Sequence, residues 1–146
     1  MGTRYTKNTY DDYIYAQEQA AAREALRRQL YGQLNSLQVK LNDLLTKLET
    51  FTKIKAGVDK AISELTAAEA NTENSSTLLT KYYNVDGQPR DNGNFGKLST
   101  SIASEISILT TTSNNCVQKL HETDASITST KIQIRNIQNQ IASAGL

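Results

Sequence analysis

The chain has 146 residues, enough for one domain, and its formal net charge is +1 because 16 basic residues nearly balance 15 acidic ones. This balance disfavours nucleic acid as a partner, since binding to phosphates needs a clustered basic face. Hydrophobic residues make up 38% of the chain, with no Trp and only two Phe, whereas soluble domains have roughly 45–50% apolar residues with Gly counted. The composition therefore disfavours a compact globule and favours a narrow apolar stripe, as in a coiled coil.

The first half of the chain has the pattern of a long helix. Residues 1–10 are polar and aperiodic and predict a flexible tail, and either Thr9 or Asp11 can cap the start of the helix. No Pro occurs from there to Ala70, and strong helix formers dominate. Apolar residues recur in alternating steps of four and three, interrupted only by Lys55, which predicts one apolar seam along the helix. The seam residues are Leu30, Leu34, Leu37, Leu41, Leu44, Leu48, Phe51, Val58, Ile62 and Leu65.

The middle of the chain contains the main turn signals. Asp86-Gly87, Pro89 and Asn92-Gly93 fall close together, and these residue types favour turns over regular structure. We therefore expect a helix over 11–83, either continuous or broken at the small polar residues 71–76, followed by a loop over 84–94.

A second seam follows the loop and predicts a helix over 95–143. Its apolar members keep the same alternation, and Ser113, Thr123 and Thr130 occupy intervening seam positions. Ser, Thr, Asn and Gln dominate elsewhere and lower helix propensity, so this helix needs a partner helix to persist. The sequence thus predicts an all-α fold, a long antiparallel two-helix coiled-coil hairpin over 11–146. The apolar seam residues are Ile102, Ile106, Leu109, Cys116, Leu120, Ile127, Ile134, Ile137 and Ile141.

The predicted hairpin leaves apolar residues without a partner. Folding back at the loop pairs residues 95–143 with about 37–83, so about 11–34 would extend past the second helix. Two helices also cannot fully bury two seams, which predicts docking to another helical protein or self-association. The expected partner-binding residues are Tyr13, Tyr15, Leu26, Leu30, Leu34, Leu37, Leu41, Leu44, Ile134, Ile137 and Ile141.

No constellation of residues points to an enzyme. His121 is the only histidine and lacks a ligand set for a metal. Cys116 is the only cysteine, and its seam position favours packing over nucleophilic catalysis. The glycines near residue 90 lack the GK[ST] that would complete a phosphate-binding loop. We expect no catalytic residue, no cofactor and no metal.

Targeting signals are also missing from the sequence. No run approaches the ~20 apolar residues of a membrane span. No apolar stretch follows Arg4 and Lys7, so a cleavable secretory signal is not visible. We expect the protein in the cytoplasm, with any export using a route that needs no such signal.

The arrangement resembles the small helical proteins encoded beside LXG-type toxins of the bacterial type VII secretion system, which are relatives of the WXG-type hairpins. The resemblance rests on LRRQLYGQLNSLQVKLNDLLTKLETF in the first helix, the following KAGVDKAISEL, a Gly-containing turn and a Ser/Thr/Asn-rich second helix. It implies a chaperone-like or targeting partner that binds the helical N-terminal domain of the toxin, together with a second small helical protein in some assemblies.

The chain departs from that pattern at two motifs. No Trp-x-Gly occurs at the turn, where Asp86-Gly87 or Phe95-Gly96 is the nearest substitute. No Tyr follows Tyr83, so the Tyr-x-x-x-Asp/Glu export signal is missing and would belong to the partner or to the complex. The sequence leaves a second hypothesis open, a self-assembling structural coiled coil of a filament, phage particle or scaffold.

Overall fold

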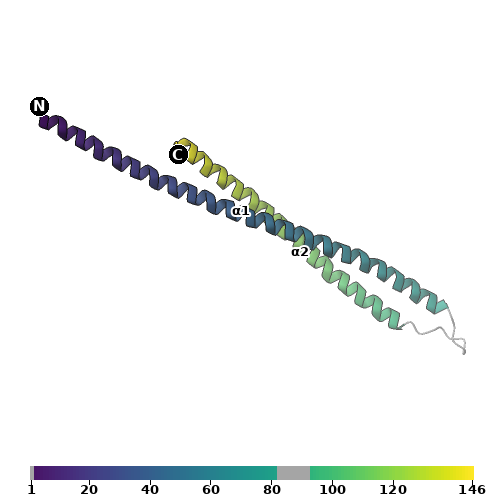
Figure 1. The fold of residues 1–146 in the computed structure, drawn as a ribbon. Helices are drawn as coiled ribbons and strands as arrows, with labels where there is room; N and C mark the ends of the chain where they lie inside the picture. The colour runs from purple at the N-terminus through teal and green to yellow at the C-terminus, as the bar shows by residue number, and fades with distance from the viewer. Residues whose placement is uncertain (1, 82–92) are drawn as a thin grey trace. The chain divides into compact units, whose positions relative to one another are not determined.

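The computed structural model describes residues 2–81 and 93–146. Helix α1 spans Gly2–Lys81 and helix α2 spans Gly93–Ser143, and the two pack against each other in an all-α hairpin (Figure 1). The hairpin consists of two units, each an antiparallel pair of segments from α1 and α2. The terminal unit contains Met1–Leu45 and Ala125–Leu146, and the inner unit contains Thr46–Asp124.

Helix α1 is longer and more regular than the sequence predicts. It begins at Gly2 rather than at Asp11, because no Pro or Gly interrupts the chain between Thr3 and Tyr31. It also continues through 71–76, where the Thr72 hydroxyl donates to the carbonyl of Ala68 at 2.8 Å. That bond satisfies the side chain inside the helix, so it does not compete with the helical backbone.

The expected loop over 84–94 is only partly within the described residues. Residues 82–92 lie outside them, and α2 already begins at Gly93. At its other end α2 finishes with Gly145 in the left-handed region, at φ 68°. The N–H of Leu146 donates to the carbonyl of Ile141 at 3.0 Å, and that of Gly145 to the carbonyl of Ala142 at 3.1 Å. This pair of bonds is a Schellman motif, which requires the φ that Gly adopts freely.

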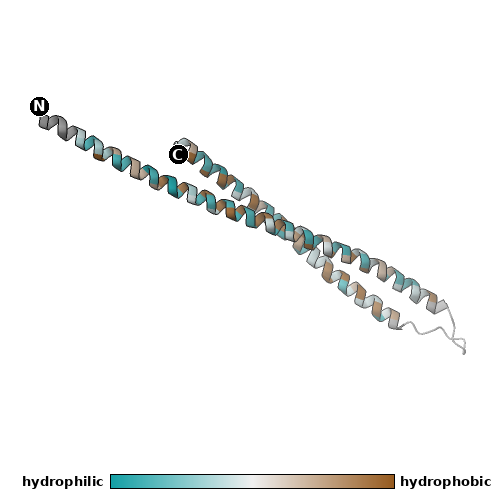
Figure 2. Cartoon of the chain, in the orientation of Figure 1, coloured by the Kyte–Doolittle hydropathy of each residue, from teal (hydrophilic) through white to brown (hydrophobic). Residues whose placement is uncertain are grey.

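The predicted seam is the shielded stripe of both helices. Apolar residues recur at intervals along α1 and α2 (Figure 2), and in the described part of the chain Leu30, Cys116 and Ile127 are the buried apolar side chains. Ser113, Thr123 and Thr130 are buried at the seam positions predicted for them. In α1 the same alternation continues past Leu65, the last predicted member, through the half-buried Glu69, the buried Thr72 and the half-buried Ser76. The other seam residues are half-buried.

The terminal unit corrects the predicted pairing of the helices. Arg23 Nη2 donates to the carbonyl of Gly145 at 2.7 Å, and the Tyr31 hydroxyl donates to a Leu146 oxygen at 3.4 Å. The end of α2 therefore lies beside Arg23–Tyr31 rather than beside residue 37, a shift of about two helical turns. The predicted extension over 11–34 is wrong in its second half, and only the turns before Arg23 continue past α2 (Figure 1).

In the inner unit, the pairing of the two helices is shifted from the predicted one in the same direction. Ser113 Oγ donates to Asp59 Oδ1 at 2.6 Å across the two helices. Phe95 shares a groove with Thr72 and Ser76, so the start of α2 lies beside residues well before the end of α1. A shift by about one heptad keeps every seam residue facing the partner helix, which explains why the seam pattern alone could not fix the register.

Candidate functional site

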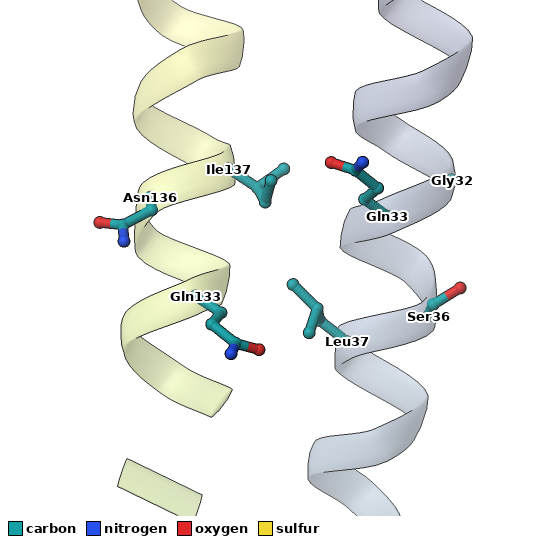
Figure 3. A pocket seen from close by; sticks show the side chains of 7 residues that line it. All are labelled: Gly32, Gln33, Ser36, Leu37, Gln133, Asn136 and Ile137. Atoms are coloured by element: carbon teal, nitrogen blue, oxygen red, sulfur yellow. The ribbon is translucent and has the colours of Figure 1, made fainter. Parts of the chain in front are cut away.

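An open groove of about 680 Å³ lies between α1 and α2 in the terminal unit. Leu37 and Ile137 point toward one another from the two helices, and the side chains of Gln33 and Gln133 extend into the space between them (Figure 3). Ser36 and Asn136 point away at the outer edges (Figure 3). The lining residues are Gly32, Gln33, Ser36, Leu37, Gln133, Asn136 and Ile137.

The heptad pattern explains why these residues share one side of the hairpin. Gln33 and Ser36 each come immediately before a seam residue of α1, and Gln133 and Asn136 each come immediately before a seam residue of α2. At 3.6 residues per turn, a residue just before a seam position lies on one flank of the seam and a residue just after it lies on the other. The groove therefore belongs to the preceding flank of both helices.

The groove combines an apolar floor with neutral edges. Leu37 and Ile137 are half-buried and supply the floor. None of the seven lining residues carries a charge, and a Cβ added at Gly32 would meet no atom within 4 Å. The lining contains no acid or base that could activate the hydroxyl of Ser36 as a nucleophile. It can accept a row of apolar side chains and offer amide groups for hydrogen bonds.

A second groove of about 680 Å³ lies in the same unit, near the end of α2. Tyr15 and Leu26 line it and are exposed, at 64% and 41%. Tyr13 lies outside this groove at 59% exposure, and its hydroxyl accepts a hydrogen bond from Gln17 Nε2 at 2.9 Å. The remaining lining residues are Ala16, Gln19, Ala20, Ala22, Arg23, Ala144 and Leu146.

Arg23 and Tyr31 hold the last residues of the chain against α1, a role that the sequence did not predict. Besides its bond to Leu146, the Tyr31 ring lies under the guanidinium of Arg27, whose Cζ is 5.5 Å from the ring centroid. Arg27 also pairs with Glu24 at 3.4 Å. Because Arg23 and Leu146 line the second groove, the bonds of Arg23 and Tyr31 to the end of α2 help to shape it.

The predicted partner-binding residues divide into five groups in the structure. Leu37 and Ile137 meet in the first groove, and Tyr15 and Leu26 line the second. Tyr13 is exposed. Leu30 is 3% exposed, so α2 already covers it and it is not part of a free surface. The half-buried seam residues are Leu34, Leu41, Leu44, Ile134 and Ile141.

Sequence reasoning missed the polar edges of the first groove. Gly32, Gln33, Ser36, Gln133 and Asn136 are not apolar, so a search for unpaired hydrophobic residues does not find them. The available signal was the run of uncharged residues immediately before the seam positions in this part of both helices.

The inner unit contains a polar cluster that links its two helices. Asp59 accepts a hydrogen bond from Ser113 and pairs with Lys55 Nζ at 2.5 Å. The hydrogen bond from Lys55, together with that from Ser113, lowers the pKa of the Asp59 carboxyl below its ordinary value. The side chains of Lys55 and Asp59 are 33% and 44% exposed, so solvent screens the pair.

Other titratable residues form no site in the described part of the chain. His121 is exposed, and Cys116 is buried in the seam of α2. Among residues 2–81 and 93–146, no three His, Cys, Asp or Glu side chains gather where they could hold a metal ion.

Neither described helix contains a stretch long and apolar enough to cross a membrane.

Comparisons with known proteins do not assign the chain to a family. No family model matches it, and no curated protein or solved structure matches it either.

Proposed function

We propose that this chain is a non-enzymatic binding protein that packs the helical N-terminal domain of an LXG-type toxin against its terminal unit. It would act as the toxin's chaperone-like or targeting partner in type VII secretion. The observation that carries the proposal is the groove between Leu37 and Ile137, an apolar surface that the hairpin itself leaves uncovered.

The incomplete burial of the seam supports a helical occupant. Leu34, Leu41 and Ile134 are at seam positions but stay half-buried, because two helices shield each other from one side only. Helical bundles complete such seams with a third or fourth helix that packs side chains between those already present. The toxin as the source of that helix rests on the resemblance of the long leucine-rich helix and the Ser/Thr/Asn-rich second helix to the LXG partner proteins.

Co-expression with the N-terminal region of an LXG-type toxin encoded beside this chain tests the proposal. We expect the two proteins to elute together and to give the mass of a complex by light scattering. Separate elution at micromolar concentration would overturn the proposal.

Two glycine variants test whether the groove is the contact. Gly32 lines the groove, whereas Gly57 lies in α1 of the inner unit, and a Cβ at either position would meet no atom within 4 Å. Replacing either by Gln should stabilise the free hairpin by roughly 0.5–1 kcal/mol, because Gly is a poor helix former. We expect only Gly32→Gln to prevent complex formation, since its side chain occupies space that the partner needs. Equal binding by both variants would exclude the groove.

The same variants separate the proposal from self-assembly. If the chain alone forms a defined oligomer that Gly32→Gln converts to monomer, a second copy occupies the groove. That result would support the structural coiled coil and overturn the toxin-partner proposal.

A further inference from the structure

The groove side of the terminal unit is uncharged along one stretch of each helix. On the groove side, the residues immediately before the seam positions are uncharged from Gln29 to Ser36 in α1 and from Ser126 to Gln140 in α2. Toward the inner unit the same flank carries Lys40 and Asp43, which come immediately before Leu41 and Leu44 and do not line the groove. The groove-side residues in these two stretches are Gln29, Gln33, Ser36, Ser126, Ser129, Gln133, Asn136 and Gln140.

The basic residues of α2 in this unit follow seam residues instead of preceding them. Lys131 comes directly after Thr130, and Arg135 comes directly after Ile134. Helical geometry places both on the flank opposite the groove. No other Lys, Arg, Asp or Glu occurs between Ala125 and Leu146, so the charges of this segment are all turned away from the groove side.

The inner unit shows that neutrality is not a general property of this flank. There the residues immediately before seam positions include Lys47 and Glu64 in α1 and Glu105 and Lys119 in α2. A helix that packs on this flank of the inner unit would meet charges of both signs, whereas a helix within the terminal groove would meet the uncharged side chains that line it.

We infer that the terminal groove selects a helix whose apolar stripe is flanked by uncharged polar residues such as Gln, Asn and Ser. A Glu or Lys beside the partner's stripe would lose water at Gln33 and Gln133 without gaining an opposite charge, which is unfavourable. Uncharged amides can instead pair with the groove amides, because each both donates and accepts. The inference rests on the proposed function and adds the chemical class of the bound helix.

Three fluorescent peptides test this selectivity directly. Each is a three-heptad helix with the same Leu stripe and with Gln, Glu or Lys at all flanking positions, used at nanomolar concentration to limit its self-association. We expect the full chain to bind the Gln peptide at least about tenfold more tightly than either charged peptide. Binding of the Gln peptide should change little with salt, because no ion pair forms.

Charge variants at two glutamines of α2 locate the effect. Gln133 lines the groove, and Gln138 is exposed on the opposite flank. Gln133→Glu and Gln133→Lys should each weaken binding of the Gln peptide about tenfold, for the same reason of uncompensated charge. Gln138→Glu and Gln138→Lys, the matched controls, should leave it within about twofold.

The outcomes separate this inference from the proposed function. Preference for the Glu or the Lys peptide, or opposite effects of the two Gln133 variants, would show recognition of a charged helix and overturn the inference, while helix binding itself would stand. Equal effects at Gln133 and Gln138 would also overturn it, because the flank would not matter. Failure of all three peptides and of the toxin domain to bind would overturn both proposals.

Discussion

The terminal and inner units have the same seam alternation but place different residues at its most shielded positions. Among the side chains that the structure describes in the terminal unit, three are buried, and two of them are the apolar Leu30 and Ile127. In the inner unit, the buried seam residues of α2 are Ser113, Cys116 and Thr123, all small. At these buried positions apolar burial, whose free energy is proportional to the area removed from water, therefore contributes more to the terminal unit than to the inner unit.

The comparison extends to the surfaces beside the seam. The terminal groove has a leucine and an isoleucine as its floor and no charged lining residue. The groove in the inner unit is smaller, about 390 Å³, and includes Glu73. The same heptad repeat therefore has beside it one groove with an uncharged lining and one whose lining includes a carboxylate.

The largest expected effect is at Leu30, the most shielded apolar residue of the terminal unit. Leu30→Asp should cost several kcal/mol, comparable to the whole stability of a domain, because a carboxylate would be buried among apolar groups. Leu41→Asp, at a half-buried seam position, should cost less. Urea unfolding followed by circular dichroism measures both. The exposed Leu26→Asp is the control, and a cost equal to that of Leu30→Asp would mean that α2 does not cover Leu30.

A smaller effect is expected at Cys116 in the inner unit. The residue is buried, and a larger side chain has to push the helices apart. Cys116→Leu should destabilise the hairpin by roughly 1–3 kcal/mol, the usual cost of overpacking. Cys116→Ala, which needs no extra space, serves as the matched control in thermal melting. A Leu variant as stable as wild type would show that the inner unit has room at this position.

Replacing a buried threonine should change stability in the opposite direction. Thr130 is 1% exposed, and its hydroxyl donates to the carbonyl of Ser126 at 2.8 Å. That carbonyl lies in the helix interior and keeps its backbone bond when the hydroxyl is removed. Thr130→Val should therefore stabilise the terminal unit by up to about 1 kcal/mol. The same change at Thr123, whose hydroxyl donates to Lys119, gives the inner-unit comparison. Clear destabilisation at Thr130 would reveal a structural need for its hydroxyl.

The smallest effect is the pH dependence that Asp59 gives the inner unit. Its pKa is lowered in the folded state by Lys55 and Ser113, so its contribution is fully present above the ordinary carboxyl pKa of about 4. The contribution is lost as the pH falls through the lowered folded value. Wild type should therefore lose more stability than Asp59→Asn when melting is followed from about pH 7 to pH 3. Parallel curves for the two proteins would contradict this assignment.

The sequence determined the helices and the phase of their seam. Alternating steps of four and three placed Leu37 in the seam of α1 and Ile137 in that of α2 without any knowledge of the fold. This is possible because residues three or four apart in the sequence lie on the same side of an α-helix. The same spacing placed Thr130 in the seam of α2, and the structure shows that its side chain is buried.

Only the tertiary structure decided the register and, with it, the candidate site. A heptad repeat looks the same after a shift of one heptad, so it could not say whether α2 ends beside residue 37 or beside Arg23. The contacts of Arg23 with Gly145 and of Asp59 with Ser113 depend on which turns meet across the hairpin. The register also brings Gln33 of α1 and Gln133 of α2 to the same groove. Which residues of two helices lie side by side depends on how the helices pack, and the periodicity of each helix alone does not determine it.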